Sequence, residues 1–155
     1  MALSSRYRSY ATVSAFAHAT EDEARVKAAI LKILPPEIAE KSEFSCTAMN
    51  GHHGNPILEL KSSIAKKKEA DKILLKILHE LSPLDETLLD GELSNHLDER
   101  NRFYLRLDKQ QAFLGYVSMG YHDVISFAFR LNSKPESLKE LRNILETVVG
   151  NGESV

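Results

Sequence analysis

The sequence predicts a single α+β domain, built as a mostly antiparallel sheet with amphipathic helices on one face. Several stretches alternate apolar and polar residues with a period of two, as expected of strands with one buried face. Others repeat apolar residues at helical spacing. The chain has 155 residues, of which 43% are hydrophobic and 27% charged. That length and composition are typical of one globular domain with a substantial core.

The first elements are a flexible arm, a strand and a helix. Residues 1–9 are expected to form a mildly basic arm, and the alternation A-T-V-S-A-F-A-H predicts a strand over 10–18. Thr20 begins the sequence T-E-D-E, which is typical of a capping box and predicts a helix immediately after it. Pro35 and the proline that follows it end that helix at Leu34.

A hairpin and two helices come next. Residues 43–49 and 57–64 both alternate and are joined by the loop G-H-H-G-N-P, so we expect them to pair. Cys46 alternates with apolar neighbours in the first of these strands and is interpreted as a small core residue. Residues 70–81 carry an apolar stripe opposite lysines. Ser82, with the proline after it, marks the start of a second, acidic helix.

The C-terminal part of the chain predicts further strands and helices. The expected elements are a strand over 101–108, a short helix capped by Asp108 and ended by Gly115, a strand over 124–131, and a helix from near Ser133 to Gly150. Residues 151–155 are expected to be a disordered tail. The domain proper therefore covers residues 10–150.

Charge is unevenly distributed along the chain. The formal net charge is −2 at pH 7, which argues against nucleic-acid binding through overall charge. Residues 61–76, however, hold six lysines against two acids, and residues 100–109 hold four basic residues against one aspartate. Residues 85–99 hold six acids and no lysine or arginine. Basic and acidic surfaces are therefore expected to be separate.

Several function classes lack their sequence signatures. No stretch approaches the roughly 18 apolar residues of a membrane-spanning helix, and the N-terminal sequence lacks the apolar core of a secretory signal. The single cysteine cannot form an internal disulfide, which fits a reducing cytosol, and we expect a cytoplasmic protein. Phosphate-binding loops, dinucleotide-binding glycine motifs, nucleophile elbows and zinc-protease motifs are absent. The sequence favours a binding protein without cofactor or metal.

The loop G-H-H-G-N-P is the first candidate site. His52 and His53 are adjacent, and on extended backbone adjacent side chains point apart, which disfavours a shared zinc ion. Acid–base catalysis would need a carboxylate beside them. Contact with phosphate or base edges demands less, because imidazole N–H groups and the amide of Asn55 donate hydrogen bonds. The alternative is a tight hairpin whose imidazoles are merely exposed.

The sequence R-F-Y-L-R-L-D-K-Q is the second candidate. Arg102, Tyr104 and Arg106 share one face of the predicted strand and combine guanidinium groups with an aromatic ring, a combination that binds single-stranded RNA. An ordinary solvated strand face is the alternative. Lys109 and Gln110 begin the following short helix, where free N–H groups favour an anion.

A run of lysines is the third candidate. Lys66, Lys67 and Lys68 lie opposite the apolar stripe of the helix that they begin. Such a face attracts RNA by charge. It is also what a soluble helix surface looks like without any ligand.

Three stretches together resemble a known family. "HATEDEARVKAAI" (18–30), "GHHGNPI" (51–57) and "YLRLDKQQAFLG" (104–115) look like the small archaeal RNA-binding proteins described as predicted exosome-associated subunits. The resemblance implies a fold similar to the large-subunit ribosomal protein that binds 5S ribosomal RNA, and a non-catalytic role with RNA. The matching polar positions are Thr20, Glu21, His52, His53, Asn55, Arg106, Asp108, Lys109 and Gln110. Thr20 and Asp108 are interpreted mainly as helix caps.

These observations lead to one hypothesis and two alternatives. The hypothesis is a cytoplasmic, non-enzymatic RNA-binding protein that accompanies the exosome and uses the histidine loop and residues 106–110 as one surface. The first alternative is a small enzyme that acts on a phosphorylated or nucleotide ligand with His52 or His53 as acid–base group. The second is a protein–protein adaptor whose acidic helix, residues 85–99, binds a basic partner. The oligomeric state is left open, a homodimer included.

Overall fold

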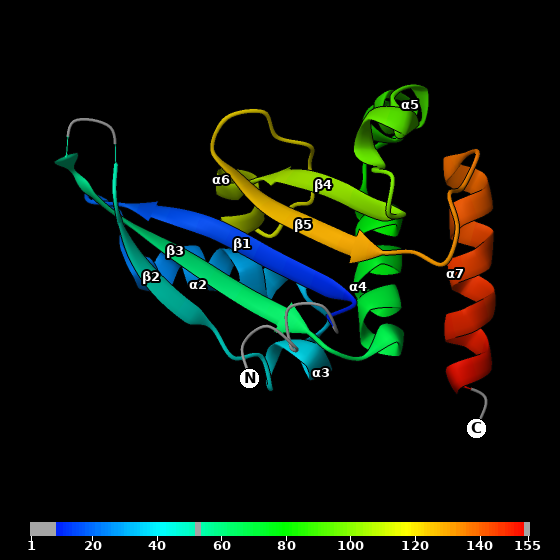
Figure 1. The fold of residues 1–155 in the computed structure, drawn as a ribbon, viewed down its shortest axis with the longest axis horizontal. Helices are drawn as coiled ribbons and strands as arrows, with labels where there is room; N and C mark the ends of the chain where they lie inside the picture. Colours follow the sequence, from blue (N-terminus) through cyan, green and yellow to red (C-terminus); the bar gives the residue numbers. More distant parts are fainter. Residues whose placement is uncertain (1–8, 52–53, 154–155) are drawn as a thin grey trace.

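A five-stranded antiparallel sheet forms the centre of the molecule, with the strand order β2-β3-β1-β5-β4 (Figure 1). The computed structural model describes residues 9–51 and 54–153. The strands are β1 (Ala11–His18), β2 (Ser45–Asn50), β3 (Pro56–Ile64), β4 (Arg102–Asp108) and β5 (Val124–Arg130). The helices are α2 (Glu23–Ile33), α3 (Pro36–Ala39), α4 (Lys67–Glu80), α5 (Pro83–Gly91), the 3-10 helix η2 (Leu93–His96), α6 (Lys109–Phe113) and α7 (Leu138–Glu153).

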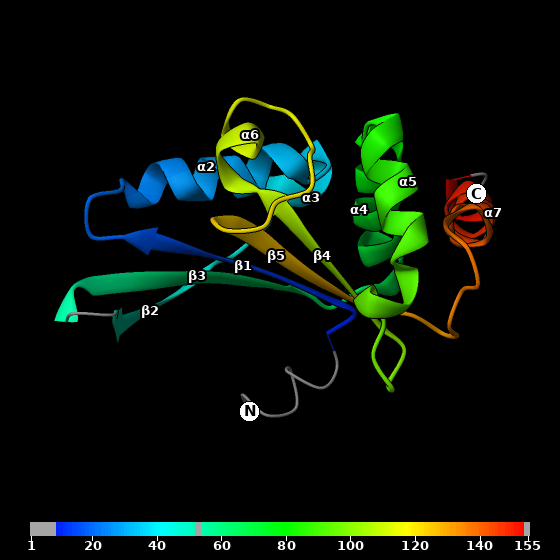
Figure 2. The ribbon, with the colours of Figure 1, turned by 90° about the horizontal axis from the view of Figure 1, so that it is seen from above.

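The described helices cover one face of the sheet, and no described helix lies on the other. Figure 2 shows α2, α3 and α6 on the same side of the sheet, with α4 and α5 at one end and α7 outermost. The inward residues of β1 are mostly alanine, which lets α2 approach the strand closely and bury Val26 and Ile30. From β5, Phe127 and Phe129 stack with 5.7 Å between ring centroids inside this core. The predicted α+β class, with helices on one face, is confirmed.

Local sequence signals fix several helix ends as expected. The hydroxyl of Ser82 accepts a hydrogen bond from the Asp85 N–H at 3.1 Å, and Pro83 occupies the first turn of α5. The Asp108 carboxylate accepts from the Gln111 N–H at 2.9 Å and caps α6. Gly115 follows α6 at a φ of +93°, a conformation that favours glycine.

Two predicted helix starts are wrong. Thr20 does not cap α2: the cap is Asp22, whose carboxylate accepts from the Ala24 N–H at 2.9 Å. Glu23, the predicted partner of Thr20, is instead the first residue of α2, so the capping box does not form. The last helix begins at Leu138 rather than near Ser133, and it runs to Glu153, past the predicted end.

The prediction that Cys46 is a core residue is also wrong. Cys46 is exposed, as are all six residues of β2. The reason is topological, because β2 is an edge strand that pairs only with β3. Alternation in the sequence therefore indicates a strand here but not a buried face. Partial desolvation and the nearby Glu23 carboxylate raise the pKa of the Cys46 thiol.

Candidate nucleic-acid interface

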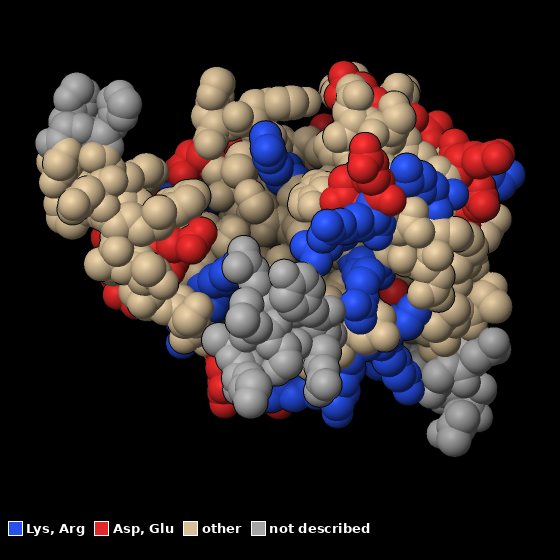
Figure 3. Space-filling model, in the orientation of Figure 1, with Lys and Arg blue, Asp and Glu red and all other residues tan. Residues whose placement is uncertain are grey.

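The uncovered side of the sheet is the main candidate interface, and we call it the open face. Buried residues alternate with its members along β1, β4 and β5, so the direction of each side chain follows from the strand period. Figure 3 looks onto this side, where Lys and Arg side chains gather over the middle and lower part. The open face comprises Thr12, Ser14, Phe16, Glu59, Lys61, Ser63, Arg102, Tyr104, Arg106, Ser126, Ala128 and Arg130.

One row of this face crosses four strands. Arg106 pairs with Ser126, Ser126 with Ser14, and Ser14 with Lys61. Neighbouring strands are about 4.8 Å apart, so the backbones of Arg106 and Lys61 are separated by about 14 Å. Two cations thus flank two hydroxyl groups on a shallow floor of small side chains. Within residues 9–51 and 54–153, no hydrogen bond or ion pair engages the Arg106 guanidinium.

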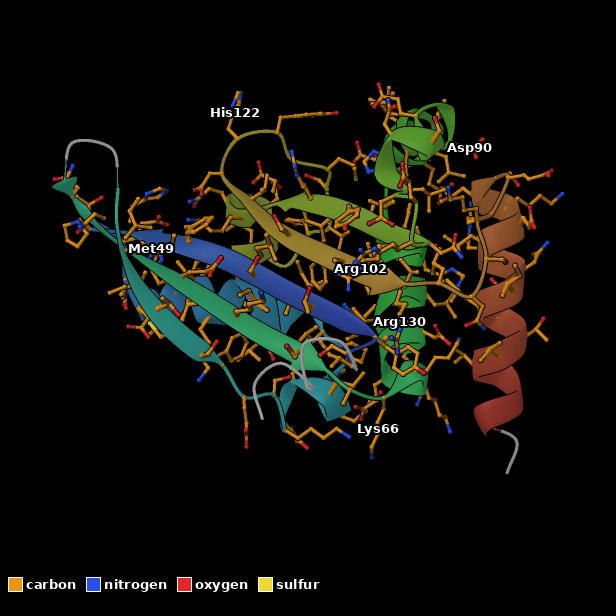
Figure 4. All side chains as sticks on the ribbon, in the orientation of Figure 1. Met49, Lys66, Asp90, Arg102, His122 and Arg130 are labelled. Carbon is orange, nitrogen blue, oxygen red and sulfur yellow. The ribbon has the colours of Figure 1, made fainter. Side chains whose placement is uncertain are left out.

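A second basic pair lies at the end of the sheet nearer α4. Arg102 and Arg130 are directly opposite each other on β4 and β5, and Figure 4 shows the two side by side. Like charges in this position repel, so a bound anion would stabilise the pair. The Arg130 guanidinium also lies 4.0 Å from the centroid of the Tyr10 ring, a cation–π contact that holds it over the strand.

Tyr104 is an exposed aromatic residue that lies between Arg102 and Arg106 along β4. Its ring is 39% exposed, and its hydroxyl donates a hydrogen bond to the Asp98 carboxylate at 2.9 Å. Partial burial and this hydrogen bond raise the pKa of Tyr104. The backbone N–H of Arg102 also donates to Asp98, which lowers the pKa of that carboxyl. The Tyr104 ring is therefore held in place and available for stacking on a base.

Lys109 does not belong to the open face, although the sequence predicts it as an RNA contact. Its side chain is only 3% exposed. The ammonium donates to the Phe16 carbonyl at 2.9 Å and pairs with the carboxylates of Glu21 at 2.8 Å and Asp123 at 2.9 Å. Lys109 thus joins β1, the turn after it and the loop before β5. These contacts use the Lys109 ammonium as a structural link, and its predicted contact with phosphate stays a prediction.

The carboxylates around Lys109 form the one cluster of potential metal ligands within the described residues, together with His18. The Lys109 ammonium already supplies positive charge to Glu21 and Asp123, so the cluster is an ion-pair network that needs no metal. Partial burial alone would raise the pKa of Glu21. Hydrogen bonds from Lys109 and from the His18 N–H outweigh it, and the pKa is lowered.

The other predicted site residues are scattered. Gln110 is exposed on α6, which lies beside α2 on the helix-covered side, so residues 106–110 cross from one side of the sheet to the other. Asn55 is exposed at the tip of the β2–β3 hairpin, and His52 and His53 lie outside the described residues. The structure therefore does not bring Asn55 and Gln110 into one surface with Arg106.

The predicted lysine run lies at the start of α4, at a margin of the molecule. Figure 4 places Lys66 below Arg130, away from the centre of the sheet. Lys67 forms an ion pair with Asp71 at 2.7 Å. Lys68 also has an interaction partner. These side chains are close enough to the lower margin of the open face to attract a nucleic acid by charge, but they do not form its floor.

The acidic residues of α5 are largely used inside the fold. The Asp85 carboxylate accepts from the Met119 N–H at 3.0 Å, and Asp90 accepts from the Leu138 N–H at 2.8 Å. Glu86 lies 3.4 Å from the Arg142 guanidinium of α7. These contacts explain much of the acidic run without a basic partner protein.

Sequence reasoning missed three of the four residues of the central row. Lys61, Ser14 and Ser126 belong to strands far apart in the chain, and only the pairing of β1 with β3 and β5 brings them together. Arg130 was overlooked in the same way. The available signal was alternation, since each of these residues follows or precedes a buried apolar residue by one position.

The comparisons with known proteins point in one direction. A family model described as RNA binding matches residues 10–131. An RNA-binding protein of Pyrococcus abyssi is 34% identical over 125 residues, which are 79% of this chain and 81% of that protein. Among the described residues, no helix has the length and apolar character needed to cross a bilayer.

Solved structures of archaeal proteins share the fold. The crystal structure of a DUF54 protein from Archaeoglobus fulgidus has a TM-score of 0.69 and 31% identity, and the match covers 89% of this chain and 96% of that one. A DUF54 protein from Sulfolobus solfataricus has a TM-score of 0.68 and 24% identity, with 92% and 98% covered. This second likeness concerns the fold alone.

Proposed function

Because the chain belongs to the family described as RNA binding, we propose that it is a cytoplasmic, non-catalytic protein that binds RNA on the open face of its sheet. The observation that carries the proposal is the central row Arg106–Ser126–Ser14–Lys61. It offers two separated cations for phosphate groups and two hydroxyl groups between them. Every helix that the structure describes lies on the other side of the sheet or at its end, which leaves this row accessible from the described part of the chain.

The aromatic residues favour a single strand over a duplex. Phe16 is 41% exposed and Tyr104 is 39% exposed, on strands that flank β5. Unpaired bases stack on such rings, whereas the bases of a duplex are already stacked on one another. Arg102 and Arg130 would then bind a phosphate at the end of the path, where the anion relieves their mutual repulsion.

A salt titration tests the proposal. We expect a fluorescently labelled single-stranded oligoribonucleotide to bind at low salt, with log K falling linearly against log salt at a slope of about −1.4 to −2.8, as two to four phosphate contacts would give. A duplex of the same length should bind more weakly. The absence of binding at 20–50 mM salt, about the range where such contacts are strongest, would contradict the proposal.

Association with the RNA-degrading exosome is a separate proposal, which follows from the family resemblance of the three sequence motifs. The test is retention of the protein on an immobilised exosome core, with and without ribonuclease treatment. Retention after ribonuclease supports direct contact. Loss after ribonuclease would mean that RNA bridges the two, and no retention in either condition would contradict the proposal.

A further inference from the structure

A pocket of about 490 Å³ opens beside β4, between α5 and the loop after α6. Its size lies within the range of small-molecule sites. The lining residues that matter here are Leu88, Asn95, His96, Tyr104, Arg106 and Tyr121. Tyr104 and Arg106 also belong to the open face, so the pocket continues from the proposed RNA path rather than lying on a separate surface.

The loop before β5 forms one wall of the pocket, and backbone hydrogen bonds hold this loop against β4. Gly120 donates its N–H to the Arg106 carbonyl at 3.0 Å, and Asp108 donates to the Ser118 carbonyl at 2.8 Å. A Cβ on Gly120 would lie 2.8 Å from the Asp108 backbone, so only glycine fits. The loop is thereby fixed against the strand, and the pocket is a formed feature of the fold.

The chemistry of the lining suits one nucleotide. Tyr104 offers a ring that is already held by Asp98, and Tyr121, which is 75% exposed, offers a second ring at the rim. The Asn95 amide both donates and accepts hydrogen bonds, as recognition of a base edge requires. A base therefore finds both a stacking surface and a polar edge here.

The polar groups of the lining are of two chemical kinds. His96 Nδ1 lies 2.7 Å from the Tyr104 carbonyl, which can only accept, so Nδ1 carries the proton and the neutral ring keeps Nε2 as an acceptor. Glu92 adds a carboxylate to the same lining. These acceptors match the N–H donors of a base, whereas the Arg106 guanidinium in the same lining matches phosphate.

We propose that this pocket takes up one unpaired nucleotide of the bound RNA, with the base between Tyr104 and the α5 side and the phosphate on Arg106. This inference rests on the proposed RNA-binding function. A free mononucleotide has the same chemistry, and the two sources are distinguished below.

The test uses a single-stranded oligoribonucleotide that carries one 2-aminopurine, whose fluorescence falls on stacking, and the variant Leu88→Trp. Leu88 is 43% exposed and lines the pocket, so a larger side chain should fill the entrance without disturbing the core. We expect wild-type protein to quench the 2-aminopurine and Leu88→Trp to weaken RNA binding about 10-fold and abolish the quenching, because stacking of one base is worth about 1–3 kcal/mol.

The matched control is Leu84→Trp. Leu84 lies one turn earlier on α5, is 68% exposed and does not line the pocket, so this variant should bind and quench as wild type does. Both variants should unfold at the wild-type temperature. RNA binding that is unchanged in Leu88→Trp would overturn the pocket proposal but not the proposal that the open face binds RNA. If the wild type binds no RNA at all, both the pocket proposal and the proposed RNA-binding function are wrong.

Free nucleoside monophosphates give the last arm. They should bind weakly to the wild type and compete with the RNA. Shifts of the Asn95 and His96 resonances in NMR spectra measure this binding. Tight binding of a mononucleotide together with no affinity for RNA would instead favour a site for a small nucleotide ligand, and the inference would be wrong.

Discussion

Arg106 and Lys109 are three residues apart and carry the same charge, yet they lie in opposite environments. Arg106 is exposed on the open face, and no contact within the described residues engages its guanidinium. Lys109 is buried and joined to three oxygen-bearing partners from other parts of the chain. One residue is available to a ligand, and the other is part of the scaffold.

The difference shows that the direction of a side chain matters more than its charge. Arg106 lies within β4, where the strand period fixes which way it points. Lys109 is the first residue of α6, just where the chain leaves the strand for the helix layer. Glu21 and Lys109 both belong to the sequence stretches that carry the family resemblance, and they form an ion pair with each other. A motif residue in an RNA-binding family can thus serve the fold.

Lys109→Met should give the largest effect, on stability. The variant leaves the Glu21 and Asp123 carboxylates facing each other without their cation. Both are partly solvated, so we expect a loss of about 2–3 kcal/mol in the free energy of unfolding, measured by urea denaturation, rather than the full cost of breaking a buried pair. Lys139→Met, an exposed lysine on α7, is the control and should change stability by less than about 0.5 kcal/mol.

The RNA affinity of folded Lys109→Met should stay within about 2-fold of wild type, since the buried ammonium reaches no ligand. A large loss of affinity with unchanged stability would show that Lys109 contacts RNA rather than stabilising the fold.

Arg106→Ala should show the opposite pattern. We expect about 10-fold weaker RNA binding at low salt and a salt slope smaller in magnitude by about 0.7, the value for one phosphate contact on a single strand. Stability should stay within about 0.5 kcal/mol because the side chain is exposed. Fluorescence anisotropy across a salt series measures the affinity, with Lys139→Ala as the charge-matched control. Equal losses in the two variants would point to general charge attraction.

The pH dependence of the Glu21→Gln variant tests whether the ion pair between Glu21 and Lys109 stabilises the fold. The pKa of Glu21 is lowered from 4.5 in the folded protein, so its ion pair stabilises the fold above that pH and the contribution is lost as pH falls through the lowered value. The variant should be about 1 kcal/mol less stable at pH 7. This gap should close in acid, as followed by urea denaturation between pH 3 and 7, roughly the titration range of a carboxyl group. A gap that does not depend on pH would show that Lys109 gains nothing from the Glu21 charge.

Cys46→Ser should have the smallest effect. Because the thiol is exposed on the edge strand, its replacement should change stability by less than about 0.5 kcal/mol. A thiol reagent should label native protein without denaturant, faster as pH rises toward the raised pKa. Labelling that requires unfolding would show that the Cys46 thiol is buried.

The fold was largely accessible from sequence because its signals are local. Alternation marked the strands, and Ser82 and Asp108 capped the helices as expected, since each of these effects acts over a few residues. The failures involve distant partners. Lys109, predicted as a phosphate contact, is instead held by Glu21, which lies 88 positions away in the chain.

The candidate site was accessible only in part for the same reason. The strand period predicted Arg102, Tyr104 and Arg106 on one face, which the structure confirms as a placement. The rest of the central row depends on sheet order, which the period does not give. The pocket depends on three segments, 88–96, 104–106 and 119–121, that no single motif contains.

Chemical-shift mapping tests the central claim most directly. On addition of a single-stranded oligoribonucleotide to isotope-labelled protein, we expect the largest amide shifts at Ser14, Lys61, Arg106 and Ser126, the four members of the central row. Shifts concentrated instead on Gln110 and the helix-covered side, with the row unchanged, would contradict the account.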